Sequence, residues 1–113
     1  MSEAAEFIAD LDEELRDRGQ TVTLRRTVTN GAPIEISVPA IISGYELEEL
    51  VGDIVQTDQR MILSPTGQAG PFASAPIRRD DVALFEGRKH TVASVDPIYI
   101  GGSVIRYNCR VSG

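Results

Sequence analysis

The stretch that decides the fold is DVALFEGRKHTVASVDPIYIGGSVIRYNCRV, residues 81–111. Short runs rich in β-branched and aromatic residues, separated by Gly and Pro turns, are typical of an antiparallel meander. Glu86-Gly87 and Gly101-Gly102 stand where two-residue hairpin turns are expected, because glycine accepts a positive φ. The last run alternates apolar and polar residues, which predicts one buried face made of Ile105, Tyr107, Cys109 and Val111.

The segment before this meander also has the period of β-strands. From residue 20 onward Val22 and Leu24 are expected to face inward, and Asn30-Gly31 is a strong hairpin signal. Pro39 predicts an edge position or a bulge, since proline cannot donate to a ladder. Residues 54–57 and 60–64 are interpreted as one long strand that is kinked near Asp58-Gln59, or alternatively as two strands joined there by a tight turn. Basic residues on strands are typical of sheet edges that are protected against pairing with other chains, and here they are Arg25, Arg26, Arg106 and Arg110. A partner could equally add a strand to such an edge.

The N-terminal segment predicts a helix from about Glu3 to Arg18, capped by Ser2 and followed by Gly19. Its apolar residues form a narrow stripe at helical spacing, and this stripe is the candidate partner-contact surface: Phe7, Ile8, Leu11 and Leu15. One interpretation is a surface helix laid across the β-domain. The other is an acidic arm that packs on a neighbouring subunit or a partner.

Together these patterns predict a single domain over residues 1–113, with a helical arm (1–19) and a β-domain (20–113). The fold class is α+β: an N-terminal helix followed by a small, mostly antiparallel β-barrel or sandwich with one long loop. The 113 residues contain no apolar run of the length that spans a bilayer, and the N-terminus is acidic, so neither a secretory signal nor a membrane anchor is expected. A single cysteine allows no internal disulfide and suits a reducing cytosol.

The net charge of −6 is concentrated at one end. Residues 1–18 hold seven acidic and two basic side chains, a balance of −5. The chain therefore lacks the basic surface of a protein that reads DNA.

No constellation of catalytic residues stands out. His90 is the sole histidine and is expected to be exposed or half-buried, and Cys109 is expected to be an inert buried thiol. The adjacent acids Asp80-Asp81 and Glu48-Glu49 would point to opposite faces of extended structure, which does not suit a catalytic carboxylate pair. We therefore expect no enzyme activity and no catalytic, metal or cofactor site.

Residues 65–79 are unusual because they contain three prolines, two glycines and few residues suited to a core. A loop of this length is commonly functional or disordered. It is either a mobile connection without a role, or a loop that orders against a partner or projects into a space created by assembly.

Several segments in this order resemble a known family. They are VTLRRT (22–27), GY (44–45), LVGDIVQ (50–56), MILSP (61–65), the Pro/Gly loop, DV (81–82), Glu86-Gly87, Val92, Val95, PIY (97–99) and Gly101-Gly102. From residue 20 onward the chain is similar to the head–tail joining proteins of long-tailed bacteriophages and gene-transfer particles, also called stopper, head-closure or neck proteins.

The resemblance implies a virion protein, assembled in the bacterial cytoplasm and located in the neck. It would form a homo-oligomeric ring of about six or twelve copies, contacting the portal and adaptor proteins above and the tail terminator below. The ring would close the channel after DNA packaging and dock the tail, with weak, non-specific DNA contact and no membrane contact. The loop facing the channel or a partner would carry Gly67, Gln68, Gly70 and Phe72 near its tip, with Arg78 and Arg79 at its base. Residues 46–53 are a rival loop.

Three other functions remain open at this point. A tail terminator or another minor tail protein is also a small ring former. A small β-barrel that binds a peptide along a strand edge is the second alternative, although only 5% of the residues are aromatic. A small enzyme is the third, and it is disfavoured because no constellation of catalytic residues is present.

Overall fold

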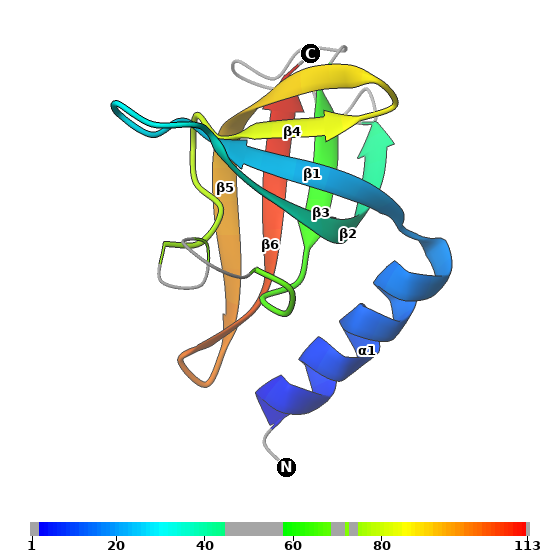
Figure 1. Cartoon of the computed structure of the whole chain (residues 1–113). Coiled ribbons are helices and arrows are strands. Elements are labelled where there is room, and N and C mark those ends of the chain that lie inside the picture. Colours follow the sequence, from blue (N-terminus) through cyan, green and yellow to red (C-terminus); the bar gives the residue numbers. More distant parts are fainter. Residues whose placement is uncertain (1–2, 45–57, 69–71, 73–74, 113) are drawn as a thin grey trace.

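The structure, a computed structural model, describes residues 3–44, 58–68, 72 and 75–112. This part of the chain folds as one N-terminal helix followed by a closed antiparallel barrel (Figure 1). The elements are α1 (Glu3–Arg18), β1 (Gln20–Arg26), β2 (Ile34–Gly44), β3 (Gln59–Leu63), β4 (Val82–Phe85), β5 (Arg88–Ile100) and β6 (Ser103–Ser112). The predicted α+β fold is confirmed, as a barrel rather than a sandwich. The first half of the long strand predicted over residues 54–64 lies outside the described residues.

The strands are ordered β1-β2-β3-β6-β5-β4, and β4 pairs back onto β1 to close the barrel. Closure removes the free edges of a sheet. The expectation of guarded edges is therefore wrong where a strand is paired on both sides, and it holds only locally, where a strand extends past one neighbour. Arg26 guards no edge, because it faces inward next to Leu24 and is buried.

Pro39 occupies an edge only locally. Residues 34–40 of β2 pair with β1, whereas pairing with β3 begins at Ile41. Pro39 therefore has a paired strand on one side, opposite Thr21, and its missing N–H breaks no ladder on the other side. A proline is tolerated in the middle of this long strand for that reason.

Two irregularities in the β5–β6 pairing decide which side chains enter the core. Between Val92 and Ser94 the register shifts, so Val92 and Val95 both face inward. Between Ile98 and Tyr99 the partner on β6 jumps from Arg106 to Val104, which leaves Ile105 unpaired, as in a β-bulge.

The second bulge corrects the prediction for β6. Tyr107, Cys109 and Val111 belong to the core as expected, but Val104 rather than Ile105 packs against it. Ile105 is buried on the other side of the hairpin, beside Leu11 of α1. The full core cluster is Val22, Leu24, Val38, Ala40, Met61, Leu63, Phe72, Ile77, Ala83, Phe85, Val92, Tyr107, Cys109 and Val111.

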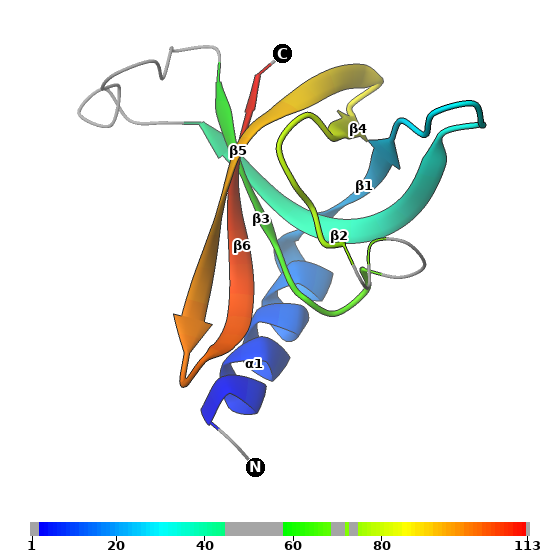
Figure 2. The ribbon, with the colours of Figure 1, turned by 90° about the vertical axis from the view of Figure 1, so that its left-hand side faces the viewer.

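Two predicted turns are confirmed by their backbone angles. Glu86 and Gly87 have φ of 54° and 71°, and Gly101 and Gly102 have φ of 58° and 82°. Positive φ at both central residues is the feature of the type I′ turn, whose twist matches that of paired strands. The β5–β6 hairpin, which ends in the second turn, extends well beyond the other strands of the barrel (Figure 2).

Helix α1 begins at Glu3 and ends at Arg18, the bounds predicted from the sequence. It packs mainly on β6 and β2, and Leu15 is completely enclosed there. Gly19 makes the join possible: its N–H bonds to the Leu15 carbonyl at 2.9 Å, and a Cβ at this position would lie only 2.8 Å from the Ala40 carbonyl oxygen. Glycine is therefore needed at position 19 because the backbone there lies too close to that of β2 to leave room for a side chain.

Candidate functional site

The loop over residues 65–79 folds back onto the barrel where the structure describes it. Phe72 is fully buried and Ile77 nearly so, and both belong to the core. Gln68 is also buried: its Nε2 donates to the Ser64 carbonyl at 3.1 Å, and its Oε1 accepts from the Ile77 N–H at 2.9 Å. The expectation that this segment adds little to the core, and that Gln68 and Phe72 lie near a projecting tip, is wrong.

The other predicted loop residues are placed differently. Gly67 is exposed in a turn with φ of 90°, and Gly70 lies outside the described residues. Arg78 and Arg79 are exposed, as expected for the base of the loop. Only these arginines and Gly67 are therefore available to a partner among the predicted loop residues that the structure describes.

A buried arginine holds the C-terminal part of this loop. Arg26 Nε and Nη2 donate to the Asp81 carboxylate at 2.9 and 2.7 Å. Its Nη1 and Nη2 also donate to the carbonyls of Ala75 and Pro76, at 2.6 and 2.9 Å. Its guanidinium lies over the ring of Phe72, 4.1 Å from the centroid. Such a cluster satisfies a desolvated charge pair, so contacts within the chain fix the course of residues 75–81.

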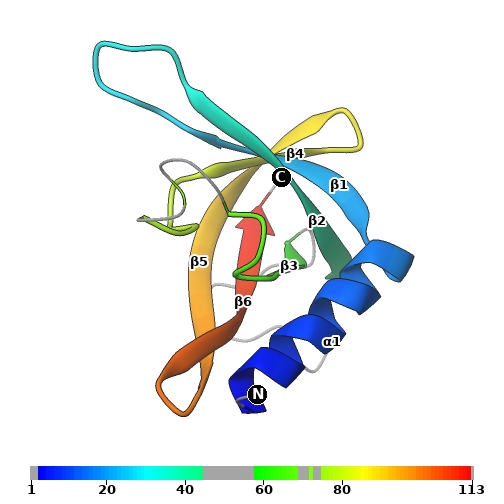
Figure 3. The ribbon, with the colours of Figure 1, turned by 60° about the horizontal axis from the view of Figure 1, so that its bottom comes forward.

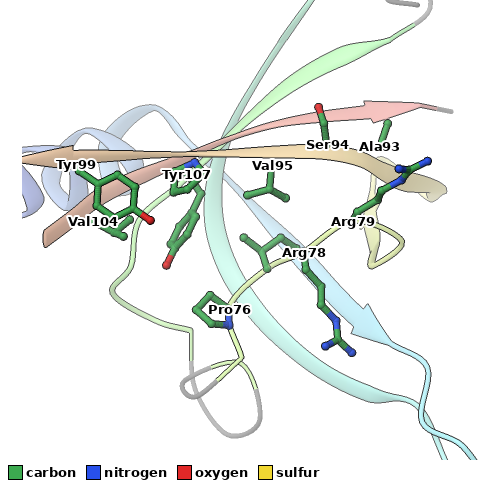
Figure 4. Close-up of a pocket in the computed structure, with 11 residues that line it drawn as sticks. Pro76, Arg78, Arg79, Ala93, Ser94, Val95, Tyr99, Val104 and Tyr107 are labelled. Carbon is green, nitrogen blue, oxygen red and sulfur yellow. The ribbon is translucent and has the colours of Figure 1, made fainter. Parts of the chain in front are cut away.

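Figure 4 shows a groove between the β5–β6 hairpin and the loop segment that Arg26 holds. Its volume is about 710 Å³. Tyrosines lie at one end and arginines at the other, with an apolar floor between them. The lining residues that define this hairpin groove are Pro76, Ile77, Arg78, Arg79, Ala93, Ser94, Val95, Pro97, Tyr99, Val104 and Tyr107.

The charges of this hairpin groove favour an anionic occupant. Arg78 and Arg79 are exposed, and in the described part of the chain neither guanidinium has a carboxylate partner. Tyr107 stays neutral at ordinary pH, because burial first and then Tyr99 and Cys109 raise its pKa. The groove thus combines apolar contact, phenol groups and two free cations.

The helix carries a second exposed surface. The predicted stripe is divided: Leu15 is buried, Ile8 and Leu11 are half-buried, and Phe7 is 47% exposed. Phe7 lies at the border of the stripe, where α1 meets β6 in a shallow groove with Leu11 and Ile105. Part of the stripe therefore serves the chain's own barrel, as in the first interpretation, and Phe7 remains outside it.

The two residues with the greatest catalytic potential are buried. Burial, with a smaller contribution from Asp81, raises the pKa of Cys109 to about 12, so the thiol is protonated and a poor nucleophile. His90 is buried rather than exposed, because its register opposite Ala83 turns it inward, and its ring stacks on Phe85 with centroids 3.9 Å apart. Burial first, and then Arg88, lower its pKa.

The remaining polar candidates are structural or lie elsewhere. Asp81 is bound by Arg26 and also accepts from the Arg78 N–H at 3.0 Å, whereas Asp80 is exposed. Glu48 and Glu49 lie outside the described residues. Within the described ranges, no three His, Cys, Asp or Glu side chains gather as a metal site would require. No helix in that part of the chain has both the length and the apolar character needed to cross a membrane.

Neither a protein-family model nor a curated protein matches this chain.

Sequence reasoning missed the Arg26–Asp81 pair and the groove. Arg26 follows Val22 and Leu24 at a spacing of two residues, which predicts that it faces inward with them. His90 stands two residues before Val92, and the same alternation predicts that it is buried. The hairpin groove could not be predicted from any local sequence pattern, because it forms between residues 76–79 and a hairpin that begins nine residues later.

Proposed function

We propose that this protein is a structural component of a virion neck. It forms a ring between the portal–adaptor assembly and the tail, closes the DNA channel and docks the tail. The observation that carries the proposal is the pair of unlike exposed surfaces on one barrel: an acidic helix and a groove ending in two free arginines. A closed ring of identical chains needs two different complementary patches on each subunit.

The chemistry of the described residues supports a role through shape. Cys109 is protonated and enclosed, and His90 is buried against Phe85. Arg26 and Asp81, a charged pair removed from water, hold a loop in place. These residues stabilise one conformation of the barrel and its loop, as a building block requires.

The charge of the chain supports a DNA channel without strong binding. Each phosphate that a protein neutralises adds salt-dependent affinity, which would hinder DNA passage. The net charge of −6 opposes such binding. Arg78 and Arg79 add only two exposed positive charges, so any hold of the protein on a DNA end is weak and non-specific.

The mass of the purified protein, alone and mixed with the proteins encoded beside it, tests this proposal. We expect a small species alone and a ring on the portal–adaptor complex, visible by light scattering and negative-stain electron microscopy. Rings that stack on tail tubes instead would identify a tail terminator. Binding to neither, with tight binding to a short peptide, would contradict a neck role.

A further inference from the structure

The most exposed large apolar side chains of the described residues are two aromatic rings. Phe7 on α1 is 47% exposed, and Tyr99 at the tyrosine end of the hairpin groove is 58% exposed. A single exposed apolar residue is ordinary on a protein surface. Here Phe7 borders an acidic surface of the helix, and Tyr99 stands at the opposite end of the hairpin groove from the cationic side chains of Arg78 and Arg79.

The acidic surface is one continuous face of α1. Six of its acids fall within an arc of roughly 100° at 3.6 residues per turn, and this arc begins beside Phe7 and turns away from Leu15. The residues of this acidic face are Glu3, Glu6, Asp10, Glu13, Glu14 and Asp17. All six are exposed. Asp10 and Glu14 also line the groove that α1 forms with Ile105 and Arg106 of its own barrel, and the other four acids are available to cations outside it.

The chain's own helix does not occupy its own groove. Helix α1 packs on the side of the hairpin that carries Ile105 and Arg106, whereas the hairpin groove is lined by Val104 and Tyr107. The bulge at Ile105 separates these two sides. Figures 1 and 3 agree with this, because α1 and the loop segment lie on different sides of β5 and β6.

We propose that the hairpin groove of one copy receives the acidic face of α1 from a second copy. Phe7 of the incoming helix lies against Tyr99 and the apolar floor, and its acids pair with Arg78 and Arg79. Offset or edge-to-face aromatic contact and charge complementarity both favour this occupant. The inference rests on the proposed ring, because a helix-to-groove contact is heterologous and repeats around an axis.

Disulfide trapping tests this contact directly. Glu6→Cys protein and Ser94→Cys protein, which both keep Phe7 and Tyr99, are mixed at high concentration in a glutathione redox buffer, and the mixed dimer is measured by mass spectrometry. Docking raises the effective concentration of the two thiols, so we expect at least about tenfold more mixed dimer than from Glu6→Cys with Lys89→Cys. Lys89 is an exposed residue at the far end of β5 and is the matched control. Equal yields would overturn the proposal.

Charge reversal tests the ionic part. Arg78→Glu/Arg79→Glu in the Ser94→Cys protein should abolish the enrichment, and Asp10→Lys/Glu13→Lys in the Glu6→Cys protein should restore it. These four side chains are exposed, so folding is expected to be preserved, and circular dichroism checks it. The charge pairing would be rejected if the enrichment persisted after reversal of the two arginines alone. It would also be rejected if reversal of the two acids did not restore the enrichment.

The outcomes also separate this contact from the neck function. Rings on the portal–adaptor complex without trapping between residues 6 and 94 would retain the function and reject the contact. If the disulfide is trapped but particles assemble normally without the protein, the contact is retained and the neck function is rejected.

Discussion

Arg26 and Asp81 lie 55 positions apart in the chain, yet two N–H···O bonds of 2.9 and 2.7 Å join their side chains. Their side chains are only 7% and 3% exposed. Arg26 ends β1, Asp81 precedes β4, and these strands close the barrel. The same guanidinium binds the loop carbonyls that form one wall of the hairpin groove. One ion pair therefore joins the ends of the two strands that close the barrel and also holds the loop segment beside the groove.

Removing one partner of this pair should be strongly destabilising. Asp81→Ala leaves the Arg26 charge buried without its carboxylate, and we expect the free energy of unfolding to fall by about 3–5 kcal/mol. Urea denaturation followed by circular dichroism measures this change.

The neighbouring pair Arg25–Glu35 is the matched control. Its 2.6 Å contact is just as short, but the side chains are 31% and 45% exposed. Glu35→Ala should therefore cost no more than about 1 kcal/mol. Similar losses of unfolding free energy in both variants would show that burial does not determine how much the Arg26–Asp81 pair contributes to stability.

Gly19 should not tolerate a side chain. A Cβ there would lie 2.3 Å from the Leu15 carbonyl oxygen and 2.8 Å from that of Ala40. Gly19→Ala therefore forces α1 away from β2, at a cost of about 1–3 kcal/mol by thermal or urea unfolding. Gly44→Ala is the control, since no atom lies within 4 Å of its Cβ position, and its effect should stay within about 0.5 kcal/mol. An unchanged stability in Gly19→Ala would contradict the close approach of α1 and β2.

His90 should make the fold less stable in mild acid. Burial and Arg88 lower its pKa in the folded protein, with Glu86 opposing them, so the unfolded chain binds a proton more readily near pH 6.5. The contribution of His90 is fully present above that pH and is lost as the pH falls below it. His90→Phe keeps an aromatic ring against Phe85 and should flatten the decline in stability between about pH 7 and 5. Identical pH profiles for the two proteins would refute this assignment.

Cys109 should be inert until the barrel opens. With a pKa of about 12 and almost no exposure, its thiol should not react with Ellman's reagent at pH 8 in the native protein. In denaturant it should react with one equivalent. Rapid labelling of the native protein would show that β6 opens far more easily than this packing allows.

The local patterns were sufficient to predict most of the fold. The helix bounds, the two type I′ turns and the alternation of β1 follow from spacing and glycine positions, and each of them is confirmed. Barrel closure did not follow, because pairing of β4 with β1 depends on contacts between distant segments. Ile105 was misplaced for a similar reason: one unpaired residue shifts the side-chain parity of a strand.

The candidate site was predicted only in part. Arg78 and Arg79 were recognised as exposed charges, and the helix stripe was recognised as a contact surface with two open interpretations. Phe72 was misjudged because a phenylalanine between prolines and glycines carries no periodicity. Its burial depends on Arg26 and Asp81, which come from two other parts of the chain.

The proposed neck function requires this protein for closing the DNA channel and for docking the tail. Electron microscopy of particles assembled without it tests that claim most directly. The account predicts DNA-filled heads that lack tails and lose their DNA. Complete, tailed particles that retain their DNA and infect or transfer genes normally would contradict it.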